Sequence, residues 1–233
     1  MSFNQYLENL FHNFLKKPVD LIPSTWSSRY EYLRNLFFGF EWYEVYDFIE
    51  FTADSFLGGE TSKSFRRECN SVLEEELSGF RFVADQIAPI TDEQEIATIE
   101  QAIARTSNIS SVRVHLAHAL ELLSDKKQPD YRNSIKESIS AVEALCRIVA
   151  KKEKATLGDA LKSFSPGLEL HPALSGAFDK LYGYTNDASG IRHALMDVPN
   201  LHQEDALFML ISCSSFISYL IAKCSRMGKR LDI

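Results

Sequence analysis

Residues 130–145 read DYRNSIKESISAVEAL and carry the clearest helical pattern in the chain. Apolar residues recur there and beyond at every third or fourth position, which places them on one face of an α-helix. The stripe consists of Ile135, Ile139, Val142, Cys146 and Val149, with Ser138 and Leu145 beside it. The flank is charged and holds Arg132, Lys136, Glu143 and Arg147. We predict a helix over residues 130–152, capped by Asp130, with the stripe buried.

Helical patterns also fill most of the remaining chain. We expect helices near residues 2–16, 25–38, 42–56, 62–77, 91–105, 109–124, 156–163, 172–183 and 203–226. Thr156 suits an N-cap, and Pro172 suits a first helical position. Residues 79–90 alone show a strand pattern, with a turn at Asp85-Gln86, which predicts a short two-stranded hairpin. The sequence therefore predicts an all-α fold, a helical bundle with one β-hairpin.

The hairpin and the helix after it indicate a domain division. Thr91-x-x-Gln94 has the form of a capping box, in which each side chain bonds the backbone N–H of the other residue. This motif opens the helix that ends near residue 105. We expect an N-terminal helical domain over residues 1–105, with the hairpin near 79–90, and a helical bundle over residues 106–233.

The last predicted helix, residues 203–226, is apolar nearly all round its circumference. Such a helix must be buried, either at the centre of a bundle or in an interface between two copies of the chain. The small residues Ser212-Cys213-Ser214-Ser215 suit the close approach of a second helix. Both locations remain open from the sequence.

Composition indicates a cytoplasmic protein. The four cysteines form no C-x-x-C pair, and three lie among apolar helical residues, which is typical of buried thiols in a reducing compartment. The first residues form an amphipathic helical pattern and not a signal peptide. We expect no apolar run near the ~20 residues that a bilayer requires, and hence no membrane partner.

Charge is unevenly distributed along the chain. The net charge is -7; residues 1–125 hold 10 Lys and Arg against 20 Asp and Glu, whereas residues 126–233 hold 15 against 12. The C-terminal half tolerates a phosphate backbone but lacks the dense basic patch of a dedicated nucleic-acid-binding protein. An acidic, solvated surface accounts for most of the asymmetry.

No cofactor or metal site is expected. His115 and His118 lie three residues apart on one predicted helix, but no carboxylate or thiolate completes a ligand set at a suitable spacing. The ten glycines are dispersed, so that no phosphate-binding loop forms. The nucleophile elbow of serine hydrolases is also missing.

Residues 182–197, YGYTNDASGIRHALMD, form the most unusual stretch of the sequence. A polar, glycine-bearing loop is expected to enter a short helix that carries Arg192 and His193. An arginine is always charged and holds a phosphate, and a histidine titrates near neutrality and moves a proton. The alternative is structural: Asn186 or Asp187 caps a turn, Arg192 pairs with a carboxylate such as Glu143, and His193 is a satisfied polar residue.

The helix that begins at Asp130 and the segment Gly190-Ile-Arg-His-Ala194 together resemble a HEPN-type helical bundle. The whole chain, with its hairpin at residues 79–90 and the Thr91-Asp-Glu-Gln-Glu95 segment, is similar to abortive-infection proteins of the AbiJ type. The resemblance implies phage defence and a homodimer. It also implies a cleft between the subunits in which Arg and His cut RNA without metal.

One departure from the family pattern concerns the catalytic pair. In the family pattern, four to six residues separate the Arg from the His that follows it. After Arg192 the positions at these spacings hold Asp197, Val198 and Pro199, and none of them is a histidine. Arg113 and His118 match the pattern literally. With the chain's arginine and histidine content, however, about one such match is expected by chance. These two residues also lie about 140° apart around a helix.

Two functional hypotheses follow. In the first, the chain is an antiphage-defence protein that binds or cleaves RNA as a metal-independent endoribonuclease, with Arg192, His193, Asp197 and Glu143 in its site. In the second, it is a non-catalytic helical module that dimerises through residues 203–226 and senses a protein or small-ligand partner. The second follows from the altered catalytic pair and the acidic net charge.

Overall fold

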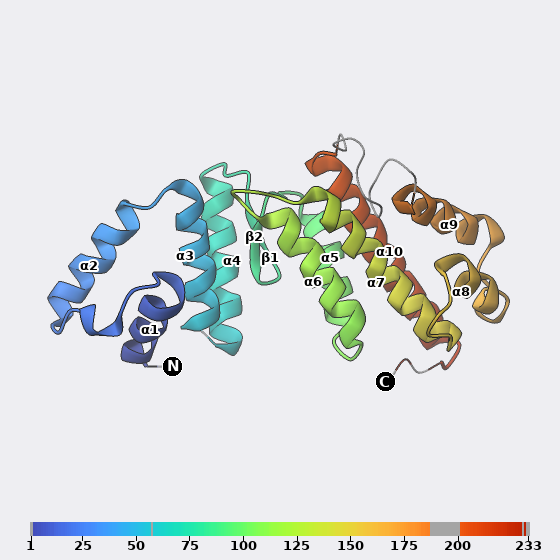
Figure 1. Cartoon of the computed structure of the whole chain (residues 1–233), viewed down its shortest axis with the longest axis horizontal. Coiled ribbons are helices and arrows are strands. Elements are labelled where there is room, and N and C mark those ends of the chain that lie inside the picture. Colours follow the sequence, from blue (N-terminus) through green and yellow to red (C-terminus); the bar gives the residue numbers. More distant parts are fainter. Residues whose placement is uncertain (1, 57, 187–200, 230, 232–233) are drawn as a thin grey trace. The chain divides into compact units, whose positions relative to one another are not determined.

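The computed structural model describes residues 2–56, 58–186, 201–229 and 231. Within them the fold is all-α, and the strands form one two-stranded antiparallel sheet, which confirms the predicted fold class (Figure 1). The chain divides into two compact units, Met1–Ile90 and Thr91–Ile233.

Unit 1 consists of helices and the hairpin. In chain order its elements are α1 (Phe3–Asn9), the π-helix η1 (Leu10–Phe14), the 3-10 helix η2 (Val19–Leu21), α2 (Trp26–Phe38), α3 (Trp42–Ser55), α4 (Gly59–Glu75), β1 (Arg81–Val83) and β2 (Gln86–Ala88). The single helix predicted over residues 2–16 is therefore an α-helix that widens into a π-helix. There the Leu15 N–H donates to the Leu10 carbonyl at 2.9 Å, one residue farther back than in an α-helix.

The core of unit 1 is rich in aromatic residues. One cluster is built on Tyr6, Leu7 and Leu10 of the first helices, and a second on Ala53, Phe82 and Ile87. Tyr6 keeps its hydroxyl satisfied, because that group lies 2.9 Å from the Thr52 hydroxyl. Burial of the ring raises the Tyr6 pKa above its ordinary value.

The hairpin is present, but its turn lies one residue earlier than predicted. Arg81 pairs with Ala88 and Val83 with Gln86, so the loop consists of Ala84 and Asp85. Ala84 adopts a φ of 53°, which an L residue seldom does. The prediction placed the turn at Asp85-Gln86 because alanine carries no turn signal.

Unit 2 contains the two longest helices among the described residues. Its elements are α5 (Glu93–Arg105), α6 (Ser110–Ser124), α7 (Tyr131–Ala150), α8 (Leu157–Phe164), the 3-10 helix η3 (Pro166–Leu168), α9 (Pro172–Asn186) and α10 (Gln203–Arg226). Asp130 and Thr156 cap α7 and α8 as predicted. The predicted capping box at Thr91 is wrong: the cap of α5 is Asp92, whose carboxylate accepts the backbone N–H of Gln94 and Glu95.

The buried face of α7 largely follows the predicted stripe. Ile135, Ile139, Val142 and Cys146 are fully buried, whereas Val149, near the end of the helix, is only partly buried. Glu143, predicted at the flank, is buried. The face is therefore wider than the apolar pattern indicates, and it contains a carboxylate.

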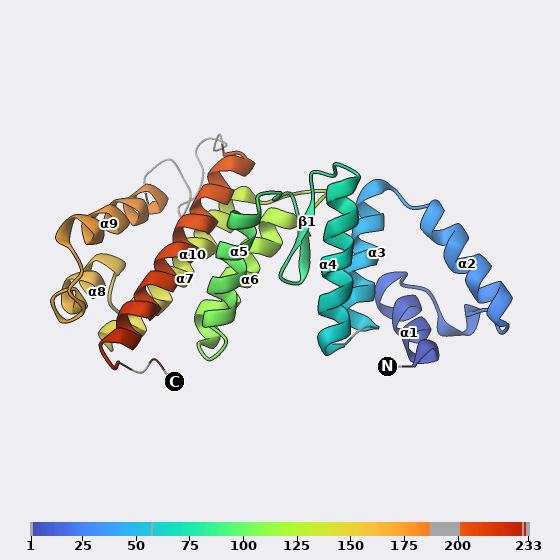
Figure 2. The same ribbon diagram turned by 180° about the vertical axis from the view of Figure 1, so that it is seen from behind.

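Helix α10 packs against α5, α6 and α7, and Figure 2 shows it on the near face of unit 2. Ten of its residues are buried against these helices, whereas Phe208 on its outer side is 59% exposed. By length and composition it is the one helix among the described residues that could cross a membrane, which corrects the expectation that no run is long enough. Core helices of soluble proteins pass the same test, and half of the apolar window of α10 is buried.

All four cysteines are free thiols, and Cys146, Cys213 and Cys224 are buried as predicted. Burial raises the pKa of Cys213 to about 12 and raises the pKa of Cys146 and Cys224 as well. Cys69 in α4 is half-buried, and partial burial raises its pKa.

Candidate functional site

Of the four residues predicted for the site, only Glu143 lies within the described part of the chain. Arg192, His193 and Asp197 lie outside the described residues. Glu143 and its hydrogen-bond partners lie on two helices. These are α7 and α9, and α9 ends at Asn186, six residues before Arg192.

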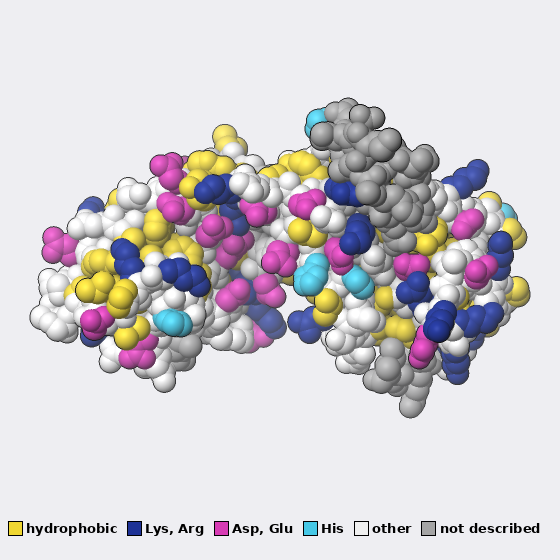
Figure 3. All heavy atoms as spheres, viewed as in Figure 1, with side chains coloured by type: hydrophobic (Ala, Val, Ile, Leu, Met, Phe, Trp, Pro, Cys, Tyr) yellow, Lys and Arg dark blue, Asp and Glu magenta, His cyan; other side chains and the backbone are white. Residues whose placement is uncertain are grey.

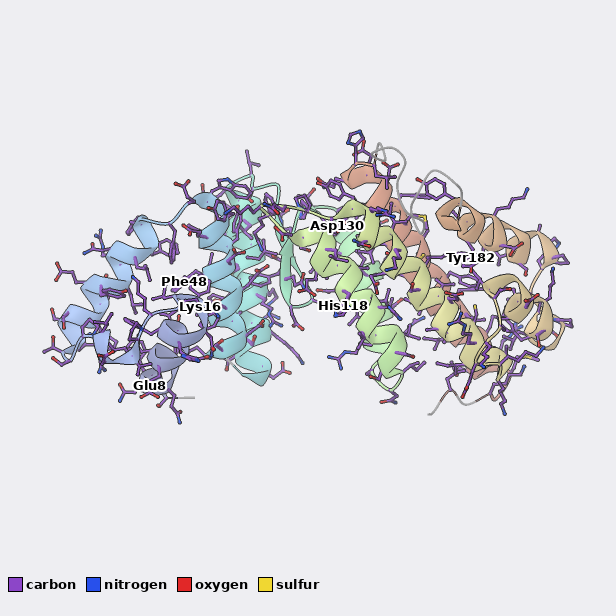
Figure 4. The ribbon with its side chains drawn as sticks, viewed as in Figure 1. Glu8, Lys16, Phe48, His118, Asp130 and Tyr182 are labelled. Atoms are coloured by element: carbon purple, nitrogen blue, oxygen red, sulfur yellow. The ribbon has the colours of Figure 1, made fainter. Side chains whose placement is uncertain are left out.

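The Glu143 carboxylate joins two helices. Its Oε1 accepts a hydrogen bond from Arg147 at 3.0 Å and one from the Tyr182 hydroxyl at 3.3 Å. Arg147 follows Glu143 by four residues on α7, a spacing that brings the two side chains together on one face. Tyr182 comes from α9, and Figure 4 shows it beside α7. The carboxylate thus fixes both a guanidinium and the neighbouring helix.

Arg147 is also held from its other side. Its Nε donates to the Ala155 carbonyl at 2.9 Å, which ties the end of α7 to the loop before α8. The side chain nevertheless remains 39% exposed. An arginine whose plane is fixed by two partners, with part of its edge open to solvent, is suited to bind an anion such as a phosphate.

A basic concavity of about 570 Å³ lies on the same part of unit 2. Its lining includes Lys152, Lys154 and Lys162 together with one carboxylate, Asp159. Figure 3 shows Lys and Arg side chains gathered over α8 and the adjoining end of α7. The sequence analysis did not predict a role for these lysines. The run Lys151-Lys-Glu-Lys154 at the end of a predicted helix nevertheless indicates a basic surface there.

A second concavity, of about 390 Å³, lies between α6 and α7 and is mostly acidic. Its lining includes His118, Glu121, Asp125, Asp130 and Glu137, and Figure 4 labels His118 and Asp130. Hydrogen bonds from the backbone N–H groups of Lys127 and Gln128 lower the pKa of Asp125, and Asp130 caps α7. Both carboxylates therefore have structural roles.

His115 contacts a carboxylate that the sequence analysis did not identify. Its Nδ1 lies 2.6 Å from Glu137 Oε2, across the α6–α7 contact. Twenty-two residues separate the two, so only the antiparallel pairing of the helices could have predicted the contact. Across the described ranges, which lack residues 187–200, no group of three or more His, Cys, Asp or Glu is arranged to hold a metal ion.

The literal match at Arg113 and His118 lies on α6, and both side chains are exposed. Five residues of α-helix rotate the second side chain by about 140° from the first. The pair therefore does not converge on one phosphate within a single chain.

Comparison with known proteins relates the N-terminal part of the chain to a family. Residues 2–105 match the family model described as AbiJ N-terminal domain 4. No curated protein and no solved structure matches the chain. The matched range covers all of unit 1 except Met1, together with α5. The match supports the AbiJ family as the family of this N-terminal part.

Proposed function

We propose that the chain is an antiphage-defence protein of the abortive-infection type whose unit 2, a HEPN-like bundle, binds RNA and cleaves it without metal. The AbiJ match over residues 2–105 suggests the defence context. The observation that supports RNA as the ligand is the basic concavity of Lys152, Lys154 and Lys162. It lies beside a partly exposed and rigidly held Arg147.

Each proposed residue has a chemical role. Arg192 neutralises the phosphate, and His193 accepts the proton of the ribose 2′-hydroxyl, which attacks the adjacent phosphorus atom. The 5′-oxygen of the next nucleotide leaves and takes up a proton, so the products are a 2′,3′-cyclic phosphate and a 5′-hydroxyl. Asp197 assists this pair. Glu143 is a positioning residue, because it acts through Arg147 and Tyr182.

Cleavage is tested with the purified full chain and 5′-labelled single-stranded RNA in excess EDTA, with products resolved on a denaturing gel. We expect metal-independent cleavage, and we expect His193→Ala to reduce its rate by at least about 100-fold. His118→Ala is the matched control, because it removes an exposed histidine of the same unit and is expected to cleave like the wild type. Intact RNA at high concentrations of the wild-type protein would exclude the catalytic role.

RNA binding is tested separately by fluorescence anisotropy. We expect reversal of Lys152 and Lys154 to Glu to weaken binding about tenfold and to reduce its salt dependence. Lys136→Glu, an exposed charge at the opposite end of α7, serves as the control. Unchanged affinity in the double variant would locate any RNA contact elsewhere.

The alternative is a non-catalytic interaction module that dimerises through α10 and senses a protein or small-ligand partner. The observation that favours it is the bonding of Glu143, because its carboxylate is engaged by Arg147 and Tyr182 and thereby serves the fold. RNA that is bound but left intact, or not bound at all, would favour this alternative.

A further inference from the structure

The outer face of α10 is largely exposed. Contacts with α5, α6 and α7 bury the inner side of this helix, and Figure 2 shows the helix on the near face of unit 2. Successive residues of an α-helix turn by about 100°, so those within about 60° of Ser215 share its face. We call this face the seam, and it consists of Glu204, Phe208, Ile211, Ser212, Ser215, Ser218, Tyr219, Ala222 and Arg226.

The order of residues in the seam is symmetric about Ser215. When two copies of α10 lie antiparallel about a two-fold axis at Ser215, each residue meets the partner's residue that lies equally far on the other side of the axis. Phe208 then meets the partner's Ala222, and Ile211 meets the partner's Tyr219. A large exposed ring thus faces a small side chain. At the centre Ser215 faces its own copy, and two small residues permit the backbones to approach closely.

The spacing of the seam keeps the two helices in contact along their length. Its principal residues are separated by 4, 3, 4, 4, 3 and 4 residues, in the order Glu204, Phe208, Ile211, Ser215, Tyr219, Ala222 and Arg226. This spacing makes two repeats of 11 residues, or about 3.67 residues per turn, which is close to the 3.6 of a straight α-helix. The row therefore runs almost along the helix axis, so that both ends of the seam meet the partner.

Charge selects the antiparallel direction. Glu204 lies at one end of the seam and Arg226 at the other, and both are exposed. An antiparallel pair brings each Glu204 to the partner's Arg226, whereas a parallel pair would bring like charges together. Arg226 also binds Glu169 at 3.1 Å, but its side chain is 60% exposed and its guanidinium has five N–H groups, enough for a second carboxylate.

A serine at the edge of the seam lacks a hydrogen-bond partner. Ser218 is only 9% exposed, and its hydroxyl has no hydrogen-bond partner among the described residues. In the antiparallel pair Ser218 lies level with the partner's Ser212. Rotation of the Ser218 side chain about its Cα–Cβ bond turns the hydroxyl towards that serine, so a second copy satisfies a group that a single chain leaves unsatisfied.

We propose that the seam of α10 is a dimerisation surface whose occupant is α10 of a second copy of this chain, antiparallel about a two-fold axis at Ser215. This inference deepens the alternative function and rests on its dimer, to which it assigns a direction and a register. One helix from each chain forms an interface at the low end of the size range, below about 1,200 Å² in total. We therefore expect a dissociation constant in the micromolar range.

Charge exchange tests the direction, with association of the full chain measured by sedimentation equilibrium. We expect Glu204→Lys to weaken association about tenfold, because two cations then meet at both ends of the seam. Arg226→Glu is expected to weaken association similarly, because two carboxylates then meet. An equimolar mixture of the two variants should recover most of the wild-type affinity, since every contact between the unlike chains again joins opposite charges.

Cross-linking tests the register, because a residue at a two-fold axis meets its own copy. We expect Ser215→Cys to form a disulfide between two chains under mild oxidation, which non-reducing gel electrophoresis detects as a dimer. Ser111→Cys is the matched control, because it places a thiol at an exposed serine of α6 outside the seam. This control is expected to cross-link no more than the wild type, whose half-buried Cys69 sets the background.

The outcomes separate this inference from the proposed functions. A wild type that stays monomeric at high concentration would overturn both the seam and the dimer of the alternative function. A wild type that dimerises, combined with a mixture that recovers no affinity and a Ser215→Cys variant that does not cross-link, would overturn the seam alone. Neither measurement involves RNA, so the cleavage and RNA-binding assays decide the first function independently.

Discussion

Two serines of unit 2 are equally buried but differ in their hydrogen bonds. Ser134 on α7 and Ser214 on α10 are both fully buried. The Ser134 hydroxyl donates to the Ala119 carbonyl at 2.7 Å, whereas the Ser214 hydroxyl has no hydrogen-bond partner among the described residues. A buried hydroxyl without a partner costs free energy, because it has lost its bonds to water.

We predict that alanine has opposite effects at these two positions. Ser214→Ala should raise the free energy of unfolding by about 1 kcal/mol, since it removes an unsatisfied polar atom. Ser134→Ala should lower it by about 1 kcal/mol, since it removes a made hydrogen bond. Urea denaturation followed by circular dichroism measures both. A loss of stability in both variants would show that Ser214 has a partner in solution.

Single residues show where prediction from sequence succeeds and where it fails. Asp130 and Thr156 were predictable as caps, because capping depends on the next three residues alone. At residues 91 and 92 two capping residues compete, and the pattern favoured Thr91 although Asp92 accepts two N–H groups. The burial of Glu143 was not predictable, because it depends on Tyr182 of a helix 39 residues farther along.

At the scale of elements, the end of α4 contains a strained backbone. The Ser78 N–H donates to the Leu73 carbonyl and the Leu77 N–H to the Glu74 carbonyl, the two bonds of a Schellman motif. The motif requires a left-handed residue, and Leu77 supplies it with a φ of 54°. Glycine is the usual residue there, because an L side chain costs about 1–2 kcal/mol in this conformation.

We predict that Leu77→Gly stabilises the protein by about 1 kcal/mol, because glycine removes the strain and the leucine side chain makes little contact. Leu77→Ala is the matched variant: it shortens the exposed side chain but keeps the Cβ atom, and its stability should stay near that of the wild type. Thermal unfolding of the three proteins compares them. Equal stabilisation by both substitutions would locate the effect in the leucine side chain instead of the backbone.

Most helices begin and end close to the predicted residues, since apolar periodicity and capping are local signals. The π-helix after α1 was not predictable. The apolar periodicity of the sequence does not distinguish an α-helix from a short segment whose backbone hydrogen bonds span one residue more. Nor did the sequence reveal that α2 keeps its aromatics exposed. A helical pattern of apolar residues indicates a face to be covered, but it does not identify whether the same chain covers it.

For the molecule as a whole, the end of the family match and the division into compact units place the domain boundary at different residues. The family match ends at residue 105, where the sequence also predicts the end of the N-terminal domain, but the compact units divide between residues 90 and 91. The difference is α5. This helix packs on α10, and its Ile99 and Ala102 are fully buried. In addition, Arg105 donates to the Ser218 carbonyl at 3.2 Å.

We predict that residues 91–233 form a more stable fragment than residues 106–233. Without α5 the shorter fragment exposes apolar surface of α10, and the loss of one large buried side chain such as Ile99 alone costs about 2–5 kcal/mol. Thermal denaturation of the two purified fragments is the measurement, with the melting temperature of 91–233 expected to be higher by several degrees or more. Equal melting temperatures would favour a boundary at residue 105.

The candidate site was only partly predictable from the sequence. Glu143 was identified, but Arg147 and Tyr182, which bind it, were noted only as a flanking charge and as part of a loop. The contact of Arg147 with Glu143 follows from their four-residue spacing on α7. The contact of Tyr182 depends on how α9 docks on α7, which no short-range pattern encodes. The lysines of the basic concavity come from α8 and from the turn before it, and the fold brings them together.

The burial of Cys146, Cys213 and Cys224 also determines how the protein meets oxidants and alkylating agents. Only a thiolate attacks such reagents, and at neutral pH a thiol with a raised pKa ionises to a very small extent. These three sulfur atoms therefore react when the helices around them separate and not before. The rate at which these thiols are alkylated therefore measures how often the helices of the bundle separate, and no label has to be attached to the protein.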